Sequence, residues 1–228
     1  MRDDEAVLLA IDTATSEVIV ALGRPDGEVL AVRRFAAERQ HGERLLGAVA
    51  GLLEDAGRGP GDITGIVVGT GPGAFTGLRV GLATAKTLAH ELGLPIAGVS
   101  TGLAILAAAG GGSASSEDAV VLLPAGPHDR VEVRSGGPAR LLPGGADPAP
   151  AARTIAIDLD GRATAAALGD GRAALVDLPG ALLKLGGERL RDGGDDVERL
   201  VPDYVTLPRG VGDSLDLEGG VTWSHDRP

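Results

Sequence analysis

The order of periodic segments in the first hundred residues constrains the fold of this 228-residue chain more than any other feature. Three runs rich in β-branched residues are separated by short polar or Pro-Asp-Gly stretches, which predicts an antiparallel three-stranded meander over 7–11, 18–22 and 29–33. The segments that follow are predicted as helix, strand, helix and strand, over 41–56, 63–69, 75–92 and 95–99.

The second half of the chain gives weaker signals. Short apolar runs predict strands, and one periodic segment predicts a helix near its end; these segments are 119–123, 131–134, 154–157 and 204–207 for the strands and 181–191 for the helix. Gly, Ala, Ser and Pro dominate 110–116 and 136–152, which are therefore predicted as loops.

Three antiparallel strands followed by helix, strand, helix and strand resemble the ribonuclease-H-like unit from which actin-like ATPases are built, usually in duplicate. We therefore expect an α/β protein with the actin-like ATPase (ASKHA, ribonuclease-H-like) fold, made of duplicated βββαβαβ units of which the second is shortened. The expected division is an N-terminal ribonuclease-H-like subdomain over 1–104 and a smaller, degenerate C-terminal subdomain over 105–228.

Composition excludes several classes of site and of partner. Cysteine is absent, so no disulfide, thiolate zinc site or cysteine nucleophile exists, and a reducing cytoplasm is the simplest location. With 32 acidic and 21 basic residues the net charge is −11, a field that repels nucleic acid. No apolar run approaches the length of a membrane span, and the start of the chain predicts no signal peptide. The sequence thus predicts a cytoplasmic protein without a membrane partner.

Two glycine-containing stretches superficially match nucleotide-binding motifs. Gly69–Ala74 fits a dinucleotide fingerprint, but it follows a meander and a helix rather than the first strand of a βαβ unit, and Pro72 lacks an N–H donor. Gly81–Thr87 is not a Walker motif, because Ala85 occupies the position of the required glycine. We interpret the first stretch as a strand-to-helix turn.

Asp12 and Thr13 stand where actin-like ATPases place a phosphate-binding loop, although Ala14 replaces its glycine. Two interpretations stay open: weak nucleotide binding by Asp12 and Thr13, or a turn without a ligand. No two of the four histidines have the spacing of a helical metal pair, and no local Ser-His-Asp arrangement is present. The sequence therefore predicts no metal site, no catalytic residue and no cofactor beyond that weak nucleotide contact.

Five motifs occur in an order that resembles the TsaB/YeaZ family, the dimerisation subunits of the bacterial tRNA threonylcarbamoyladenosine machinery. They are Asp12–Thr15, Gln40–Leu46, Gly71–Gly81, Ala85–Lys86 and Leu94–Ser100. The resemblance covers 7–105; beyond it, only the helix at 181–191 and Pro202–Tyr204 match the family ending. Asp129–Arg134 departs from the family pattern, and the tail after Pro208 has no counterpart.

The resemblance implies a non-catalytic scaffold that binds a TsaD-like catalytic subunit, together with a TsaE-like ATPase, for N6-threonylcarbamoyladenosine modification of tRNA next to the anticodon. It implies tRNA contact only through the complex, and a homodimer when the chain is alone. The His-x-x-x-His metal motif of TsaD is replaced here by Ser100–Ile105, which has no such ligand. The alternative is a small actin-like ATPase or phosphotransferase that uses Asp12 and Thr13.

Helical phase predicts which faces of the two N-terminal helices meet a partner. The apolar faces expected against the sheet are Leu45, Leu46, Val49, Leu52 and Leu53 on the first helix and Phe75, Leu78, Leu82, Ala89 and Leu92 on the second. The outward residues are small or uncharged, and in the family these helices pair with TsaD. The predicted partner interface is Gly47, Ala48, Ala50, Gly51, Thr76, Val80, Ala83, Thr84 and Thr87. The alternative is that these residues only reflect a chain rich in Ala and Gly.

Overall fold

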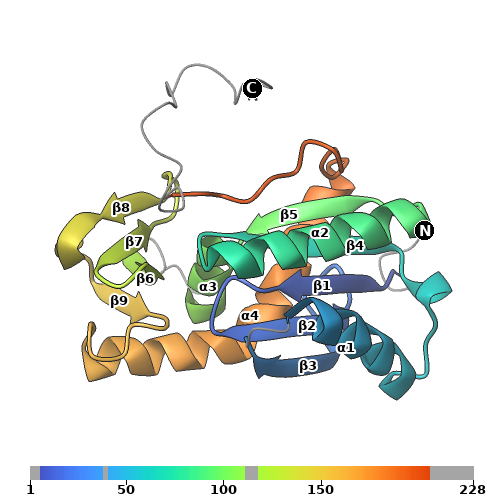
Figure 1. Ribbon diagram of the computed structural model, residues 1–228, viewed down its shortest axis with the longest axis horizontal. Helices are drawn as coiled ribbons and strands as arrows, with labels where there is room; N and C mark the ends of the chain where they lie inside the picture. The colour runs from blue at the N-terminus through green and yellow to red at the C-terminus, as the bar shows by residue number, and fades with distance from the viewer. Residues whose placement is uncertain (1–5, 38–40, 111–117, 206–228) are drawn as a thin grey trace, which may run out of the picture.

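The computed structural model describes residues 6–37, 41–110 and 118–205 and contains two β-sheets (Figure 1). The first sheet has the strand order β3-β2-β1-β4-β5. The meander β1–β3 is antiparallel, and β4 and β5 continue the sheet parallel to β1. The strands of this sheet are β1 (Leu8–Asp12), β2 (Glu17–Gly23), β3 (Val29–Ala36), β4 (Gly65–Gly71) and β5 (Ile96–Ser100).

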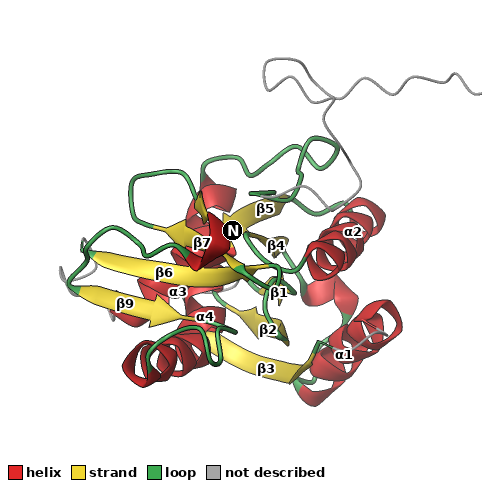
Figure 2. Ribbon diagram, turned by 60° about the vertical axis from the view of Figure 1, so that its left-hand side comes forward, coloured by secondary structure: helices red, strands yellow, loops and turns green. Residues whose placement is uncertain are grey.

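Two helices cover one face of this sheet, α1 (His41–Asp55) and α2 (Phe75–Leu92), with the short 3-10 helix η1 (Pro60–Asp62) after α1 (Figure 2). Every residue of β4 is buried, because helices cover both sides of a central parallel strand. Gly93, at a φ of 63°, ends α2 in the left-handed conformation that glycine adopts without strain. All seven segments predicted in this half are confirmed.

The second sheet, with order β8-β7-β6-β9, repeats the first four positions of the first sheet. Its meander is antiparallel, and β9 pairs parallel to β6 as β4 pairs parallel to β1. The 3-10 helix η3 (Pro143–Gly145) stands where the first half has α1, and no fifth strand continues this sheet within the described residues. Its strands are β6 (Ala119–Ala125), β7 (Asp129–Val133), β8 (Arg140–Leu142) and β9 (Arg153–Ala156). The predicted shortened duplicate is confirmed.

Two further helices join the sheets: α3 (Thr101–Gly110) and α4 (Ala165–Arg191) pack against each other and against strands of both sheets. One apolar cluster includes buried residues of both sheets and of both helices, such as Leu8, Val121, Ile105 and Leu182. A second cluster lies under α1 and α2, and a third, smaller one lies on the outer face of the second sheet. The predicted boundary between 104 and 105 falls within α3 and stays a prediction.

Several elements of the second half differ from the prediction. Helix α3 was not predicted, because it is apolar almost throughout and shows no amphipathic period. Helix α4 begins 16 residues before the predicted 181, at Ala165, and contains five glycines and Pro179, which helix propensity disfavours. The predicted loop 136–152 holds β8 and η3. In the predicted strand 204–207, the first two residues are not in a strand, and the others lie outside the described residues.

Candidate functional site

Helices α1 and α2 lie side by side on one face of the first sheet (Figure 2). Each turns an apolar stripe toward that sheet. The stripe is buried where helical period predicts it, at Leu45, Val49, Leu52, Leu53, Leu78, Leu82 and Ala89. Phe75 and Leu92 are half-buried. The remaining surface of the two helices faces outward and contains most of the predicted partner interface.

On α1, the structure corrects two residues. Leu46, predicted in the core, is 53% exposed, and Ala48, predicted in the interface, is 8% exposed and belongs to the core cluster. A helix turns about 100° per residue, so Leu46 lies a quarter-turn away from Leu45, whereas Ala48 and Val49 return to its face. The exposed face therefore presents Leu46 in place of Ala48.

Gly51 is not open surface either. A Cβ on Gly51 would overlap the guanidinium of Arg33, which donates to Asp55 Oδ2 at 2.6 and 3.1 Å. Gly47 and Ala50 are exposed, and a Cβ on Gly47 would meet nothing within 4 Å. The α1 part of the exposed face is thus Leu46, Gly47 and Ala50.

On α2, the outward residues follow the prediction with one correction. Thr76, Ala83 and Thr87 are exposed, and Thr84 is half-buried. Val80 is half-buried and packs against the core cluster, although helical phase placed it wholly outward. Ala83 is therefore the cleaner surface position.

Charged side chains near this face are directed elsewhere. Lys86 Nζ donates to the carbonyl oxygens of Glu198 and Leu200, both at 3.2 Å. The guanidinium carbon of Arg79 lies 5.0 Å from the ring centroid of Phe75, and that of Arg44 lies 4.9 Å from the ring of Phe35. Arg79 is nevertheless exposed on the same face, between Thr76 and Ala83, so the exposed strip of α2 is uncharged except for this arginine.

The Asp12-Thr13 turn lies in the interior, where the sequence left nucleotide contact open. Asp12 is fully buried and accepts hydrogen bonds from Thr101 Oγ1 at 2.6 Å and from the Ala14 amide at 3.0 Å. Thr13, 1% exposed, donates to the Gly77 carbonyl at 2.8 Å. Burial raises the pKa of Asp12, although both hydrogen bonds act in the opposite direction.

Glycines of α2 and β4 enclose this turn. A Cβ on Gly69 would overlap the Asp12 carboxylate, and one on Gly77 or Gly81 would overlap Thr13. At Gly77 the helix approaches the backbone carbonyl of Thr13, and at Gly69 and Gly81 the side chains of Asp12 and Thr13 occupy the space that a Cβ would need, so glycine fits all three positions. In this structure, the side-chain oxygens of Asp12 and Thr13 are engaged in hydrogen bonds with Ala14, Thr101 and Gly77.

A cavity of about 600 Å³ opens beside the turn, between the start of α2 and the second half of the chain. Its wall includes Phe75 and Tyr204, whose ring centroids are 5.2 Å apart, and the carboxylates of Asp158 and Asp203. Among the residues that the structure describes, no lysine, arginine or histidine lines it. This wall is poorly suited to a polyphosphate, because carboxylates without cations repel phosphate.

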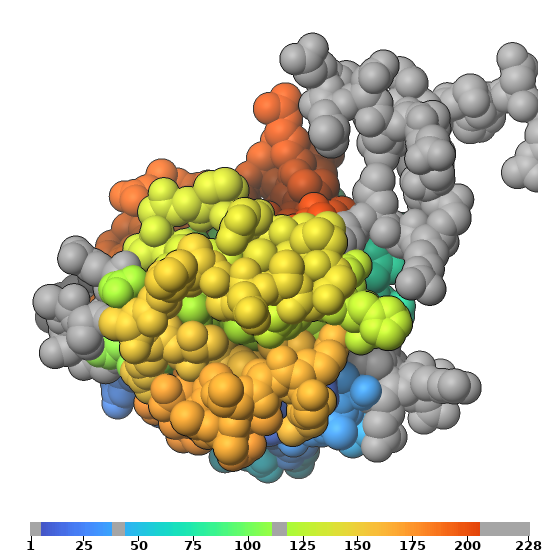
Figure 3. Space-filling view, turned by 90° about the vertical axis from the view of Figure 1, so that its left-hand side faces the viewer, coloured from blue at the N-terminus to red at the C-terminus, as the bar shows by residue number. Residues whose placement is uncertain are grey.

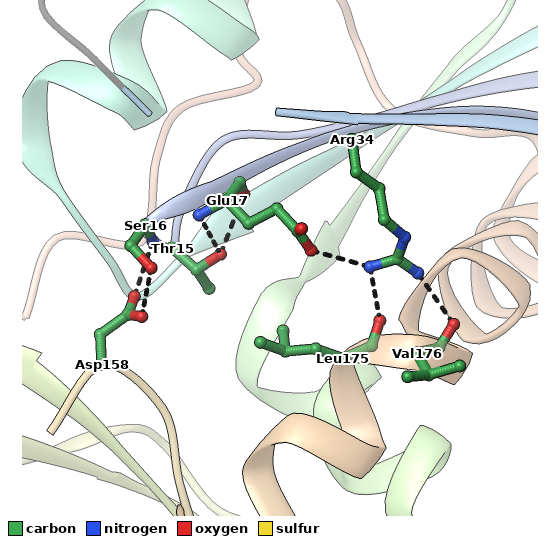
Figure 4. A network of polar contacts seen from close by, with 7 residues as sticks. All are labelled: Thr15, Ser16, Glu17, Arg34, Asp158, Leu175 and Val176. Carbon is green, nitrogen blue, oxygen red and sulfur yellow. Dashed lines mark hydrogen bonds and ion pairs between the residues drawn. The ribbon is translucent and has the colours of Figure 1, made fainter. Parts of the chain in front are cut away.

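Polar contacts tie the two halves together beside this cavity (Figure 4). The Ser16 amide donates to Asp158 Oδ2 at 2.6 Å, and its hydroxyl also donates to that carboxylate. Arg34 donates to Glu17 Oε2 at 2.8 Å and to the carbonyl oxygens of Leu175 and Val176 in α4. Sequence reasoning missed these contacts, whose partners from the two halves lie 141 or 142 residues apart.

The stretch Ser100–Ile105 forms the end of β5 and the start of α3, and its Thr101 is the partner of Asp12. Within the described ranges, no three His, Asp or Glu side chains are grouped as metal ligands. None of the helices in the described part of the chain combines the length and the hydropathy that a membrane span requires.

The duplicated sheets define an α/β protein with the ribonuclease-H-like fold of actin-like ATPases, in which the turn after β1 is closed by protein contacts. The family model described as "TsaD: tRNA N6-adenosine threonylcarbamoyltransferase" matches residues 35–158, more than half of the chain. YeaZ from Pseudomonas aeruginosa is 28% identical, with a TM-score of 0.65 over 87% of this chain and 99% of that structure. The chain therefore belongs to this family and, within it, to the TsaB/YeaZ proteins.

Two curated relatives match shorter parts of the chain, and one of them is a TsaB protein. The tRNA threonylcarbamoyladenosine biosynthesis protein TsaB of Bacillus subtilis is 44% identical over 101 residues, which are 44% of this chain and 43% of that protein. An uncharacterized protein of Mycobacterium leprae is 40% identical over 152 residues, which are 63% of this chain and 41% of that protein. The chain spans less than half the length of the curated relatives it matches.

Proposed function

We propose that this chain is a non-catalytic subunit of a tRNA threonylcarbamoyltransferase complex. It binds a TsaD-like catalytic subunit and makes that subunit competent for N6-threonylcarbamoyladenosine modification of tRNA next to the anticodon, with a TsaE-like ATPase in the same complex. Membership of the TsaB/YeaZ family supports this pathway. In isolation the same surface pairs two copies of the chain.

The observation that carries the proposal is the outer strip of α2, which is small and uncharged except for Arg79, beside the exposed face of α1. Thr76, Ala83 and Thr87 are exposed, yet a solvated helix normally carries Lys and Glu at such positions. Small side chains let a partner helix approach closely, and uncharged ones are inexpensive to desolvate. The proposed interface is this strip with Val80, Thr84, Leu46, Gly47 and Ala50.

The non-catalytic part of the proposal is supported by the Asp12-Thr13 turn. Its polar atoms are engaged by Thr101, Ala14 and Gly77, so they are not available to activate a phosphate. The chain has a net charge of −11, which opposes tRNA binding by the isolated protein. Transfer chemistry and most phosphate contacts with tRNA are accordingly assigned to the partner.

The test is size-exclusion chromatography of the chain with its TsaD-like partner. Ala83→Arg introduces a charge and a long side chain in the middle of the strip, and we expect it to abolish co-elution. Ala173→Arg makes the same change at an exposed position of α4 and serves as the control. Val80→Glu should also block association, with some loss of stability because Val80 contacts the core. Normal association of Ala83→Arg, or equal loss in Ala173→Arg, would place the interface elsewhere.

A turnover assay tests the proposal that the chain is non-catalytic. The purified chain should hydrolyse no ATP and hold no stoichiometric zinc or iron. ATP hydrolysis that Asp12→Asn abolishes in a folded variant would support the phosphotransferase alternative instead. Asp12→Asn suits this test because it keeps the size of the buried side chain while removing its charge.

A further inference from the structure

The outer face of the second sheet carries a buried cation that forms no ion pair with a buried carboxylate among the described residues. Glu132, the buried carboxylate two residues along β7, pairs instead with Arg134 and Arg140. Arg130, on β7, is 8% exposed, and its guanidinium donates to the carbonyl oxygens of Gly145, Ala146 and Arg162, at 2.7 Å for Ala146 and 3.4 Å for Arg162. Its Nε atom is buried without a hydrogen-bond partner in the described part of the chain. Burying a charge is unfavourable unless an opposite charge accompanies it, so this position favours an anion.

The carboxylate nearest to Arg130 offsets little of its charge. Asp147 Oδ1 lies 3.5 Å from the guanidinium, but the Asp147 side chain is 98% exposed. An ion pair with a carboxylate in water contributes little, because solvent screens it. Among the described residues, no other ion pair involves Arg130.

A second arginine reaches the same place from the loop before α4. Arg162 donates to the carbonyl oxygens of Gly126 and Pro127 at 3.0 and 3.2 Å, and it forms no ion pair with a described residue. Two neighbouring hollows, of about 530 and 380 Å³, have Arg130, Arg162 and Asp147 in common in their walls. They lie in the second half of the chain, whose surface fills the view in Figure 3.

The amino-terminal end of α4 adds a third source of positive potential. The larger hollow is lined by Gly161–Thr164 and by Ala167 in the first turn of this 27-residue helix. That turn contains no acidic residue. The amide dipoles of a helix place partial positive charge at its N-terminus, which favours an anion there.

We propose that Arg130, Arg162 and the amino-terminal end of α4 bind a phosphate monoester in the larger hollow. Two guanidinium groups and a helix end match a dianion, and arginine recognises phosphate through paired hydrogen bonds. A hollow of about 530 Å³ is in the size range of small-molecule sites. The site is separate from the outer faces of α1 and α2, so it does not depend on the proposed partner function.

Calorimetric titration of the purified chain tests the proposal, with inorganic phosphate as the probe and chloride replacing it at constant ionic strength. Wild type should bind phosphate saturably. Arg162→Gln should weaken the affinity at least about tenfold, through loss of a charge-assisted contact. Arg172→Gln, at an exposed arginine of α4, removes the same charge and should leave the affinity unchanged.

Asp147→Asn gives a change of opposite sign. Removing the carboxylate that competes for Arg130 should strengthen phosphate binding about two- to threefold. Arg130→Gln would also leave three carbonyl groups without their hydrogen-bond donor, so that variant does not separate a binding role from a structural one. The test therefore uses the variants at Arg162 and Asp147. Glycerol 3-phosphate should bind at least as tightly as inorganic phosphate. The proposal is overturned by no saturable binding up to about 10 mM phosphate, by equal losses in Arg162→Gln and Arg172→Gln, or by rejection of glycerol 3-phosphate.

Discussion

The two halves of the chain share one strand order but cover the outer faces of their sheets in opposite ways. In the first half, α1 and α2 pack apolar side chains on the sheet and form a large core cluster. In the second half, the corresponding face has η3 and loops, a small apolar cluster, and the buried charges of Arg130 and Glu132. In place of helices, η3 and the loops cover this face, and hydrogen bonds from Arg130 and Arg162 to loop carbonyl groups hold them there.

This difference assigns different tasks to the halves. Helices that pack through an apolar stripe leave a smooth opposite face, which suits association with another helical surface. A loop cover held by cations leaves hollows and a buried arginine whose one ion-pair partner among the described residues, Asp147, is exposed, which suits a small anion. The proposed partner surface and the proposed phosphate site follow from the two kinds of cover.

The largest expected effect concerns the apolar cover of the first half. Leu52→Ala removes a side chain that is 1% exposed under α1, and it should lower the free energy of unfolding by about 3–4 kcal/mol. Leu46→Ala, on the same helix at 53% exposure, should cost less than about 1 kcal/mol. Urea unfolding measures both. Equal losses would show that α1 is not packed as described.

The second prediction concerns the fit of α4 against the second sheet. A Cβ on Gly171 would overlap the carbonyl group of Ala156 in β9, so Gly171→Ala should cost about 1–3 kcal/mol despite the better helix propensity of alanine. Gly169 has nothing within 4 Å of such a Cβ, and Gly169→Ala should stabilise by about 0.5–1 kcal/mol. Thermal unfolding of this pair separates packing from propensity. If both substitutions stabilise, the close approach is absent.

The third prediction compares the buried carboxylate of the second half, Glu132, with the partly exposed carboxylate of the first half, Glu17. Glu132, 5% exposed, accepts from Arg134 Nε at 2.6 Å and from Arg140 at 2.7 Å. Glu132→Gln leaves two arginines without their carboxylate and should cost about 1–2 kcal/mol. Glu17→Gln should cost about 1 kcal/mol or less, since Arg34 keeps its two carbonyl partners and the pair is partly exposed. A larger loss for Glu17→Gln in urea unfolding would reverse the comparison.

The smallest expected effect is a redistribution of stability with pH. Burial opposes ionisation of Glu132, but Arg134 and Arg140 outweigh it and hold its pKa below the ordinary value of 4.5. Its contribution to stability is therefore complete above 4.5 and is lost as pH falls through the lowered pKa. Burial raises the pKa of Asp12, so its ionised form is unfavourable at neutral pH, and that cost disappears as pH falls toward 3.8.

Acid should therefore destabilise β7 and β8, because Glu132 loses its charge. It should remove an unfavourable buried charge from β1, because Asp12 becomes protonated. Hydrogen exchange, corrected for the intrinsic pH dependence of the amide reaction, should show protection falling in β7 and β8 before it falls in β1. The variant Glu132→Gln should lose this difference between the strands. Protection that falls first in β1 would contradict both assignments.

Much of the first half could be predicted from sequence, and less of the candidate surface. Apolar spacing located α1 and α2, and the residues of α2 that face outward, because a helix repeats at short range. It misplaced Leu46 and Ala48, since alanine carries too little hydropathy to mark a core position. The closure of the Asp12-Thr13 turn could not be predicted, because it depends on Thr101 and on glycines of distant elements.

The sequence by itself determined the order of the strands, the ends of α2 and the absence of cysteine chemistry, since these depend on local periodicity, turn residues and composition. Only the tertiary structure decided the course of α4, because Gly171, Gly186 and Gly187 weaken a helix alone but admit Ala156, Val67 and Pro25 at close range. It also decided that Arg130 is buried without an ion pair to a buried carboxylate among the described residues. Burial and charge balance depend on residues that are far apart in the chain, so a local sequence pattern does not predict them.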